Sequence, residues 1–108
     1  MWAMSDAPSD PVVVLMRFDA SDEAGLASVL SQYVVTSRGH PGCRNIDWCR
    51  SATVPARFVI IQKWASIEDQ RRHFDSPAMV EMAEACRGRL SGPPDIDLLD
   101  PVSAHDLA

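Results

Sequence analysis

The chain has 108 residues, of which 46% are hydrophobic, and its formal net charge is -5 at pH 7. This length allows one domain with a modest core that needs no disulfide or metal. The acidic balance argues against a nucleic-acid surface, which needs clustered positive charge, and no apolar run approaches the roughly 20 residues of a membrane span.

The N-terminal segment, residues 1–10, is small, polar and proline-containing, and we expect it to form a flexible arm. It lacks the basic and apolar regions of a secretory signal. The 3 cysteines are odd in number and contain no CxxC pair, which is typical of reduced thiols. Together these features predict a soluble, cytoplasmic protein.

The first predicted strand spans residues 11–18, an apolar run without alternation that is typical of a strand buried on both faces. Residues 21–38 follow as an amphipathic helix, with apolar side chains at helical spacing up to Tyr33 and Val34. We interpret Tyr33 as the end of this apolar stripe rather than as an active-site phenol. Gly39 and Pro41 end the helix.

Residues 43–51 form the second predicted strand, and residues 57–64 form the third, its hairpin partner. Ser66 and Asp69 make a variant capping box that starts a second helix. Ser76 and Pro77 restart that helix, with serine at the N-cap and proline at the first helical position, and it runs to about residue 90. After a Gly-Pro-Pro break, residues 96–102 form the fourth strand.

This element order, β-α-β-β-α-β, predicts an α+β ferredoxin-like domain over residues 11–102 with an antiparallel four-stranded sheet, followed by a tail at 103–108. Two helices cover only one face of such a sheet, yet the first strand is apolar on both faces. An exposed apolar face of this size promotes association. We therefore expect a homodimer in which a symmetric partner covers the second face.

Several short features follow one another in order along this domain. They are Pro41-Gly42-Cys43, Arg57-Phe58-Val59, the spacing of Trp64 and His73, Ser76-Pro77, and the closing Leu98-Leu99-Asp100-Pro101-Val102. In this combination the chain resembles the antibiotic biosynthesis monooxygenase (ABM) family. The resemblance implies a dimeric α+β barrel with a pocket in each protomer between the sheet and its helices. Family members include cofactor-independent oxygenases of phenols and hydroquinones, haem-degrading enzymes, quinol oxidases and signal-molecule isomerases, and several have no known activity.

A cofactor-free oxygenase pocket must bind a flat apolar ring, remove its proton and exclude water, because oxygen reacts with a phenolate far more readily than with a phenol. Trp64 can stack on such a ring and donate its indole N–H. His73, with an ordinary pKa of about 6.5, is the candidate base. We therefore predict Trp64 and His73 as the catalytic residues.

The walls of the predicted pocket follow from the period-two alternation of a strand. If Trp64 faces the pocket, then alternate residues of its strand and of the first strand share that face, and Asn45 and Asp47 are the polar candidates of the second strand. The predicted lining residues are Met16, Phe18, Asn45, Asp47, Phe58, Ile60 and Gln62. No pair of histidines has ligand spacing, so we expect no metal. The resemblance to cofactor-independent oxygenases implies that no cofactor is needed.

Other interpretations of the two predicted catalytic residues remain open. Trp64 is also consistent with simple core packing between sheet and helix. A lone histidine on a polar helix, such as His73, is also typical of a solvated or capping residue.

Three positions depart from the known chemistry of the ABM family. Ile60 and Gln70 stand where the cofactor-free oxygenases have an asparagine and a tyrosine, and Ala83 stands where haem-degrading members have a histidine ligand. We expect a cofactor-independent monooxygenase that acts with molecular oxygen on a small aromatic or quinol-like compound. The alternative is a non-catalytic dimeric module that binds a small apolar ligand, and haem degradation is disfavoured.

Overall fold

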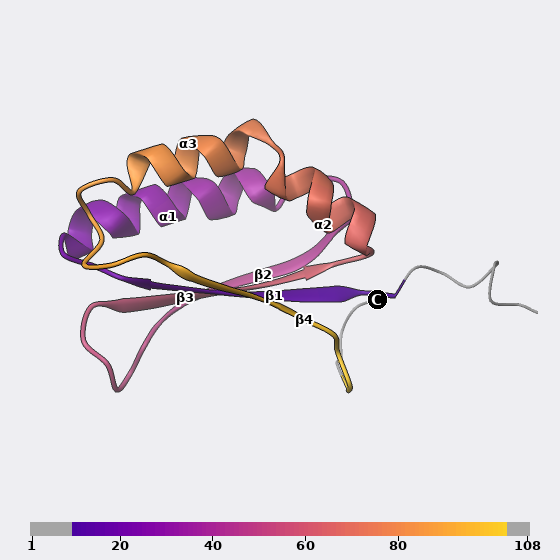
Figure 1. Ribbon diagram of the computed structural model, residues 1–108, viewed down its shortest axis with the longest axis horizontal. Coiled ribbons are helices and arrows are strands. Elements are labelled where there is room, and N and C mark those ends of the chain that lie inside the picture. Colours follow the sequence, from indigo (N-terminus) through magenta and orange to yellow (C-terminus); the bar gives the residue numbers. More distant parts are fainter. Residues whose placement is uncertain (1–9, 104–108) are drawn as a thin grey trace, which may run out of the picture.

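Four strands form one antiparallel sheet in the order β2-β3-β1-β4, and the helices pack on one of its faces (Figure 1). The strands are β1 (Val12–Asp19), β2 (Cys43–Arg50), β3 (Arg57–Trp64) and β4 (Asp95–Leu99), and the helices are α1 (Glu23–Ser37), α2 (Ile67–Phe74) and α3 (Pro77–Ala85). This arrangement confirms the predicted α+β ferredoxin-like class, with the second helix divided into α2 and α3.

The computed structural model describes residues 10–103. The predicted arm over residues 1–10 and tail over 103–108 therefore lie, apart from one residue of each, outside the described residues. Among the described helices, none has the length and apolar character needed to cross a bilayer.

The register of β1 and β3 aligns their buried side chains. Val12 pairs with Trp64 and Met16 pairs with Ile60, so alternate residues of both strands face the helices. In the protomer Val13 and Leu15 are only partly buried, so the predicted burial of β1 on both faces stays a prediction that depends on a partner copy. Among residues 10–103, no helix packs on that second face of the sheet (Figure 1).

Helix starts follow the predicted capping chemistry with two changes. Asp22 caps α1 by accepting from the Gly25 backbone N–H at 3.1 Å, so the helix begins two residues later than predicted. Ser66 caps α2 and accepts from the Asp69 N–H at 3.1 Å, as predicted. Ser76 caps α3, but its hydroxyl makes no capping bond.

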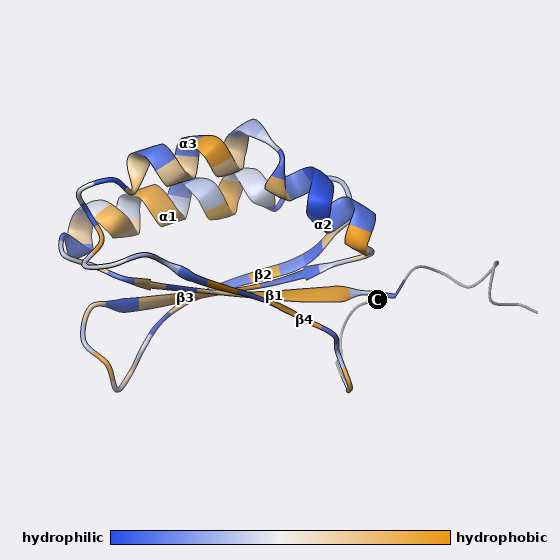
Figure 2. Ribbon diagram, viewed as in Figure 1, coloured by the Kyte–Doolittle hydropathy of each residue, from blue (hydrophilic) through white to orange (hydrophobic). Residues whose placement is uncertain are grey.

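Helix α3 ends at Ala85 rather than near residue 90. Gly88 follows it with a φ of 77°, a left-handed conformation that ends a helix. Figure 2 shows α2 as mostly hydrophilic, in contrast to the apolar end of β1 beneath it. Even so, Gln70 and His73 of α2 are buried, because residues three apart share the helix face that lies on the sheet.

Candidate active site

His73 lies in the last turn of α2 and is 1% exposed. Its ring stacks on Trp64 of β3 with ring centroids 4.6 Å apart and planes inclined at 26°. The structure thus brings together the two predicted catalytic residues. The interpretation of His73 as a solvated residue is wrong, because α2 turns this side chain toward the sheet.

A continuous chain of hydrogen bonds runs through these two rings. The Trp64 indole Nε1 donates to Oε1 of Gln62 at 2.9 Å, and Nε2 of Gln62 donates to the Tyr33 hydroxyl at 2.6 Å. The Tyr33 hydroxyl lies 2.7 Å from Nε2 of His73, and Nδ1 of His73 lies 2.8 Å from Nδ1 of His40. Tyr33 comes from α1, so the network joins α1 and α2 to β3.

The indole of Trp64 sets the direction of the first two bonds in this network. An indole N–H only donates, so it fixes the Gln62 carbonyl on its own side and turns the Gln62 amide N–H toward Tyr33. Tyr33 accepts that bond, and we assign its single proton to Nε2 of His73 at 2.7 Å, a closer and stronger acceptor than Sδ of Met16 at 3.9 Å. Neutral His73 then carries its proton on Nδ1 and donates to His40.

Burial keeps the two central groups uncharged at neutral pH. It lowers the pKa of His73 to about 4, with a smaller contribution from neighbouring His40. It also raises the pKa of Tyr33 to about 12, although the bond from Gln62 opposes this shift. A neutral imidazole that accepts from a neutral phenol agrees with the assigned direction of the Tyr33–His73 bond.

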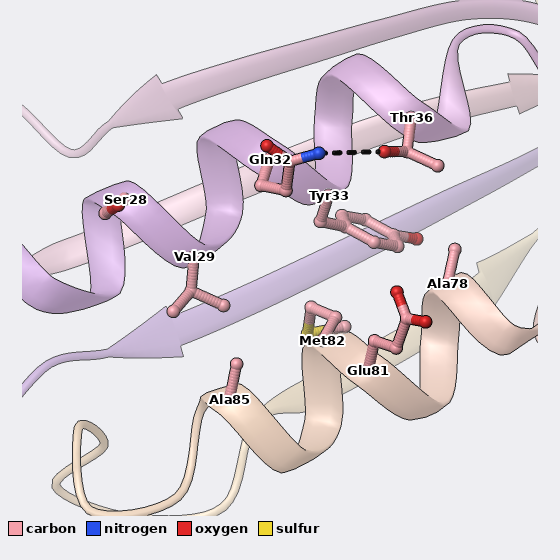
Figure 3. A pocket seen from close by; sticks show the side chains of 9 residues that line it. All are labelled: Ser28, Val29, Gln32, Tyr33, Thr36, Ala78, Glu81, Met82 and Ala85. Carbon is pink, nitrogen blue, oxygen red and sulfur yellow. Dashed lines mark hydrogen bonds between the residues drawn. The ribbon is translucent and has the colours of Figure 1, made fainter.

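A groove of about 390 Å³ opens between α1 and α3 (Figure 3). The Tyr33 ring projects from α1 into the space between the two helices, and Glu81 and Met82 approach from α3. The lining residues are Ser28, Val29, Gln32, Tyr33, Thr36, Ala78, Glu81, Met82 and Ala85. No arginine, lysine or histidine is among them, so the groove favours neutral ligands over anions.

A second cavity of about 160 Å³ lies beside the two histidines. Its lining residues are His40, Pro41, Asp69, Arg72, His73 and Ser76. The hydroxyl of Ser76 is buried there without a hydrogen-bond partner. The network therefore has Tyr33 at the groove and His40 at a separate opening.

Of the seven predicted lining residues, two join the network, three pack within the core and two lie on the opposite face of the sheet. Met16 and Gln62 join the network, since Nε2 of Gln62 lies 3.3 Å from Sδ of Met16. Three others, Phe18, Phe58 and Ile60, lie on the same face of the sheet but pack within the core. The space between sheet and helices is thus filled by side chains, and the larger groove lies between α1 and α3 instead.

Asn45 and Asp47 do not lie near His73. Ile46, between them, is 1% exposed and faces the helices, so its two neighbours point to the opposite face of the sheet. There Nδ2 of Asn45 donates to the Asp47 carboxylate at 3.2 Å. In the protomer these two side chains are not part of the pocket.

Sequence reasoning missed Tyr33 and His40 as members of the site. A buried tyrosine needs a partner for its hydroxyl, and this requirement was the available signal at the end of the α1 stripe. His40 is held by a turn in which Gly42 has a φ of 79°. A side chain on Gly42 would collide with Asp69, so this glycine lets the turn approach α2.

Metal binding has no support in the described part of the chain. Across residues 10–103, no group of three or more histidine, cysteine, aspartate or glutamate side chains could hold an ion. The ring nitrogens of His40 and His73 that face each other share a hydrogen bond.

The fold and this site define a ferredoxin-like α+β domain with a buried histidine–tyrosine pair beneath a helical groove. A family model described as antibiotic biosynthesis monooxygenase matches residues 11–85, and the chain belongs to this family. No curated protein has a sequence that matches significantly.

Solved structures with the same fold include SnoaB, a cofactor-independent oxygenase from Streptomyces nogalater. It is 21% identical over 89% of this chain and 97% of its own, with a TM-score of 0.78. Rv0793 from Mycobacterium tuberculosis is 24% identical over 88% of this chain and 98% of its own, with a TM-score of 0.82. PA3566 from Pseudomonas aeruginosa is 20% identical over 90% of this chain and 99% of its own, with a TM-score of 0.80. At these identities the likeness establishes the fold alone.

Proposed function

We propose that the protein is a cofactor-independent monooxygenase that acts on a small, neutral phenolic or quinol-like compound bound between α1 and α3. The observation that carries this proposal is the Tyr33 hydroxyl, which lies 2.7 Å from Nε2 of the buried, neutral His73. Tyr33 also lines the groove, so a bound phenol can approach a proton acceptor that is itself buried.

In the proposed reaction the substrate supplies both electrons. One oxygen atom of O₂ enters the substrate as a carbonyl or hydroxyl oxygen, and the other leaves as water. The two hydrogens of that water come from the substrate, so no flavin or metal is needed for balance. Removal of the phenolic proton raises the electron density of the ring and starts the reaction with oxygen.

The size and lining of the groove support this class of substrate. Its volume of about 390 Å³ is at the lower end of the range for small-molecule sites. The Tyr33 ring, Val29 and Met82 offer apolar contact, and Glu81 would repel a carboxylate. Trp64 does not line this groove, and we assign it to orienting Gln62 and packing on His73 rather than to substrate contact.

The free energy of proton transfer favours a base that passes the proton onward to water. A phenol has a pKa of about 10, so transfer of its proton to His73, whose pKa is about 4, costs roughly 8 kcal/mol. Release of the same proton to water at about pH 7 costs only about 4 kcal/mol. His73 therefore serves best as an intermediate acceptor.

Oxygen uptake with a panel of hydroquinones and anthrones tests the proposal. We expect turnover by the parent and a loss of about 10²-fold or more in His73→Ala, with folding checked by circular dichroism. Arg71→Ala, an exposed position on the same helix, is the matched control and should keep full turnover. Unchanged turnover in His73→Ala would rule out this base.

A non-catalytic module that binds a small apolar ligand is the second candidate. It is favoured by Ile60 and the buried Gln70, which stand where cofactor-free relatives place an asparagine and a tyrosine. Ligand binding with no oxygen uptake across the panel would support this module over the enzyme. A separate haem titration with no Soret shift would exclude haem degradation.

We also propose that the working form is a homodimer formed through the free face of the sheet. Val13 and Leu15 of β1 and Ile61 of β3 are partly exposed on that face, and Leu99 of β4, which pairs with Val13, is 36% exposed. Burial of these apolar side chains against a second copy would stabilise the pair.

A further inference from the structure

We propose that His40 is the outer end of a proton path that runs from the groove, through Tyr33 and His73, to the second cavity. This inference rests on the proposed function. His40 does not line the groove, so we assign it a relay role rather than contact with substrate.

The path has two hydrogen-bonded steps of nearly equal length. Tyr33 and His73 are joined at 2.7 Å, and His73 and His40 are joined at 2.8 Å. The Tyr33 oxygen accepts one bond from Gln62 and has a second lone pair for a substrate hydroxyl. Both histidine contacts use the ring nitrogens that proton transfer requires, with opposite nitrogens of His73 facing its two partners.

Outward transfer moves one proton across each hydrogen bond of the path. The substrate O–H bond breaks as its proton joins the Tyr33 oxygen, while the Tyr33 proton moves to Nε2 of His73. The Nδ1 proton of His73 passes to Nδ1 of His40, and Nε2 of His40 releases its proton to water. The net result is one phenolate in the groove and one proton in solvent.

The same path must run inward once in each turnover. Outward transfer leaves both histidines in their opposite tautomers, with His73 protonated on Nε2. The peroxide formed from O₂ then needs a proton before water can leave, and return of one proton along the path supplies it. This return also restores the starting tautomers, so the cycle closes with no net proton released.

Packing holds His40 in place for this role. Its backbone N–H donates to the carbonyl of Ser37 at 3.0 Å, and its carbonyl accepts from Cys43 at 3.1 Å. The rings of His40 and His73 meet edge to face with centroids 4.9 Å apart. The backbone bonds fix the main chain of His40, and the bond and ring contact with His73 orient its side chain.

The surroundings of His40 permit proton exchange with solvent. The His40 ring is half-buried and borders the cavity lined by Asp69, Arg72 and Ser76. Asp69 and Arg72 neutralise each other through an ion pair of 2.7 Å. The cavity therefore presents His40 with one compensated charge pair and the Ser76 hydroxyl.

Three His40 variants test the relay through turnover. His40→Gln keeps an acceptor for the His73 N–H but cannot pass a proton on, and we expect its turnover to fall at least about tenfold. His40→Ala should fall similarly and recover when imidazole is added, because imidazole fits the space left by the ring. His40→Phe fills that space and should not recover. Full activity in His40→Gln, or equal rescue of Ala and Phe variants, would overturn the relay.

Hydrogen exchange tests the relay without any turnover. We expect the Nδ1 proton of His73, followed by ¹⁵N-resolved NMR, to exchange with solvent at least about tenfold more slowly in His40→Phe than in the parent. Equal exchange rates would overturn the relay even if the enzyme is active. An inactive parent with slowed exchange in the variant would instead refute the proposed function and leave the path in place.

Discussion

The phenol oxygen of Tyr33 lies 2.7 Å from Nε2 of His73, a residue that is 40 positions further along the chain. Both side chains are almost fully buried and uncharged at neutral pH. Their contact joins the groove between α1 and α3 to the histidine pair near α2. The proposed chemistry depends on this contact more than on any other in the protein.

Titration of Tyr33 is predicted to be delayed in the folded protein. Burial raises its pKa to about 12, so the phenolate forms at a higher pH than in the unfolded chain, where the pKa is about 10. Folding stability should therefore fall as pH rises from about 10 to 12. The sequence contains 1 tyrosine, so tyrosinate absorbance reports this group alone. A midpoint near 10 before unfolding would contradict the buried network.

Acid is predicted to destabilise the fold through His73. Its pKa is lowered from 6.5 to about 4, so the unfolded chain binds a proton that the folded chain does not bind in this range. Stability from this group is complete above pH 6.5 and is lost as pH falls to about 4, by about 3 kcal/mol. Urea unfolding across this range should show a smaller pH slope in His73→Gln than in the parent. Arg71→Ala should keep the parental slope.

Two tryptophans provide a matched test of the Trp64 hydrogen bond. Trp64→Phe leaves the Gln62 carbonyl buried without its donor, and we expect a loss of about 1–3 kcal/mol in the free energy of unfolding beyond the packing change. The indole N–H of Trp48 is buried without a partner. Trp48→Phe should therefore lose no hydrogen bond and cost less in urea unfolding. A larger cost at Trp48 would contradict the assigned role of Trp64.

Filling the groove is predicted to weaken ligand binding without unfolding the protein. Ala78 lines the groove near the hydroxyl end of Tyr33, and Ala78→Leu should lower the affinity for a phenolic ligand about tenfold (Figure 3). Ala83→Leu, an exposed position on the same helix that does not line the groove, should bind as the parent does. Calorimetry of both variants checks this, and equal affinities would place the ligand elsewhere.

A charge on the free face of the sheet is predicted to separate the proposed dimer. We expect the parent to sediment as a dimer and Leu15→Lys to sediment as a monomer, because the symmetric contact would bury two like charges. Val35, which is 65% exposed on α1, offers the control Val35→Lys. That variant should remain dimeric. A monomeric parent at micromolar concentration would remove the proposal.

The strands and helix starts could be predicted because their causes are local. The predicted third strand coincides with β3, since its apolar run and flanking turn lie within one short segment. Ser66 and Asp69 marked the start of α2 for the same reason. Even the spacing of Trp64 and His73 suggested a shared site, because α2 follows β3 directly.

The positions of Tyr33 and His40 depended on contacts between distant segments. His40 and His73 are 33 residues apart, and they meet because Gly42 allows a close approach of the turn to Asp69. No periodicity in the sequence encodes that approach. The end of α3 likewise depended on the left-handed backbone of Gly88, which composition alone did not locate.

The sequence by itself determined the element order, the N-cap of α2 and which residues of β3 share a face with Trp64, because propensity, capping and alternation act over a few residues. Tertiary structure alone decided which polar side chains meet beneath the helices and in which direction each bond runs. The donor-only indole of Trp64 orients Gln62 toward Tyr33, and the short contact of Tyr33 with Nε2 of His73 places the proton of His73 on the nitrogen that faces His40.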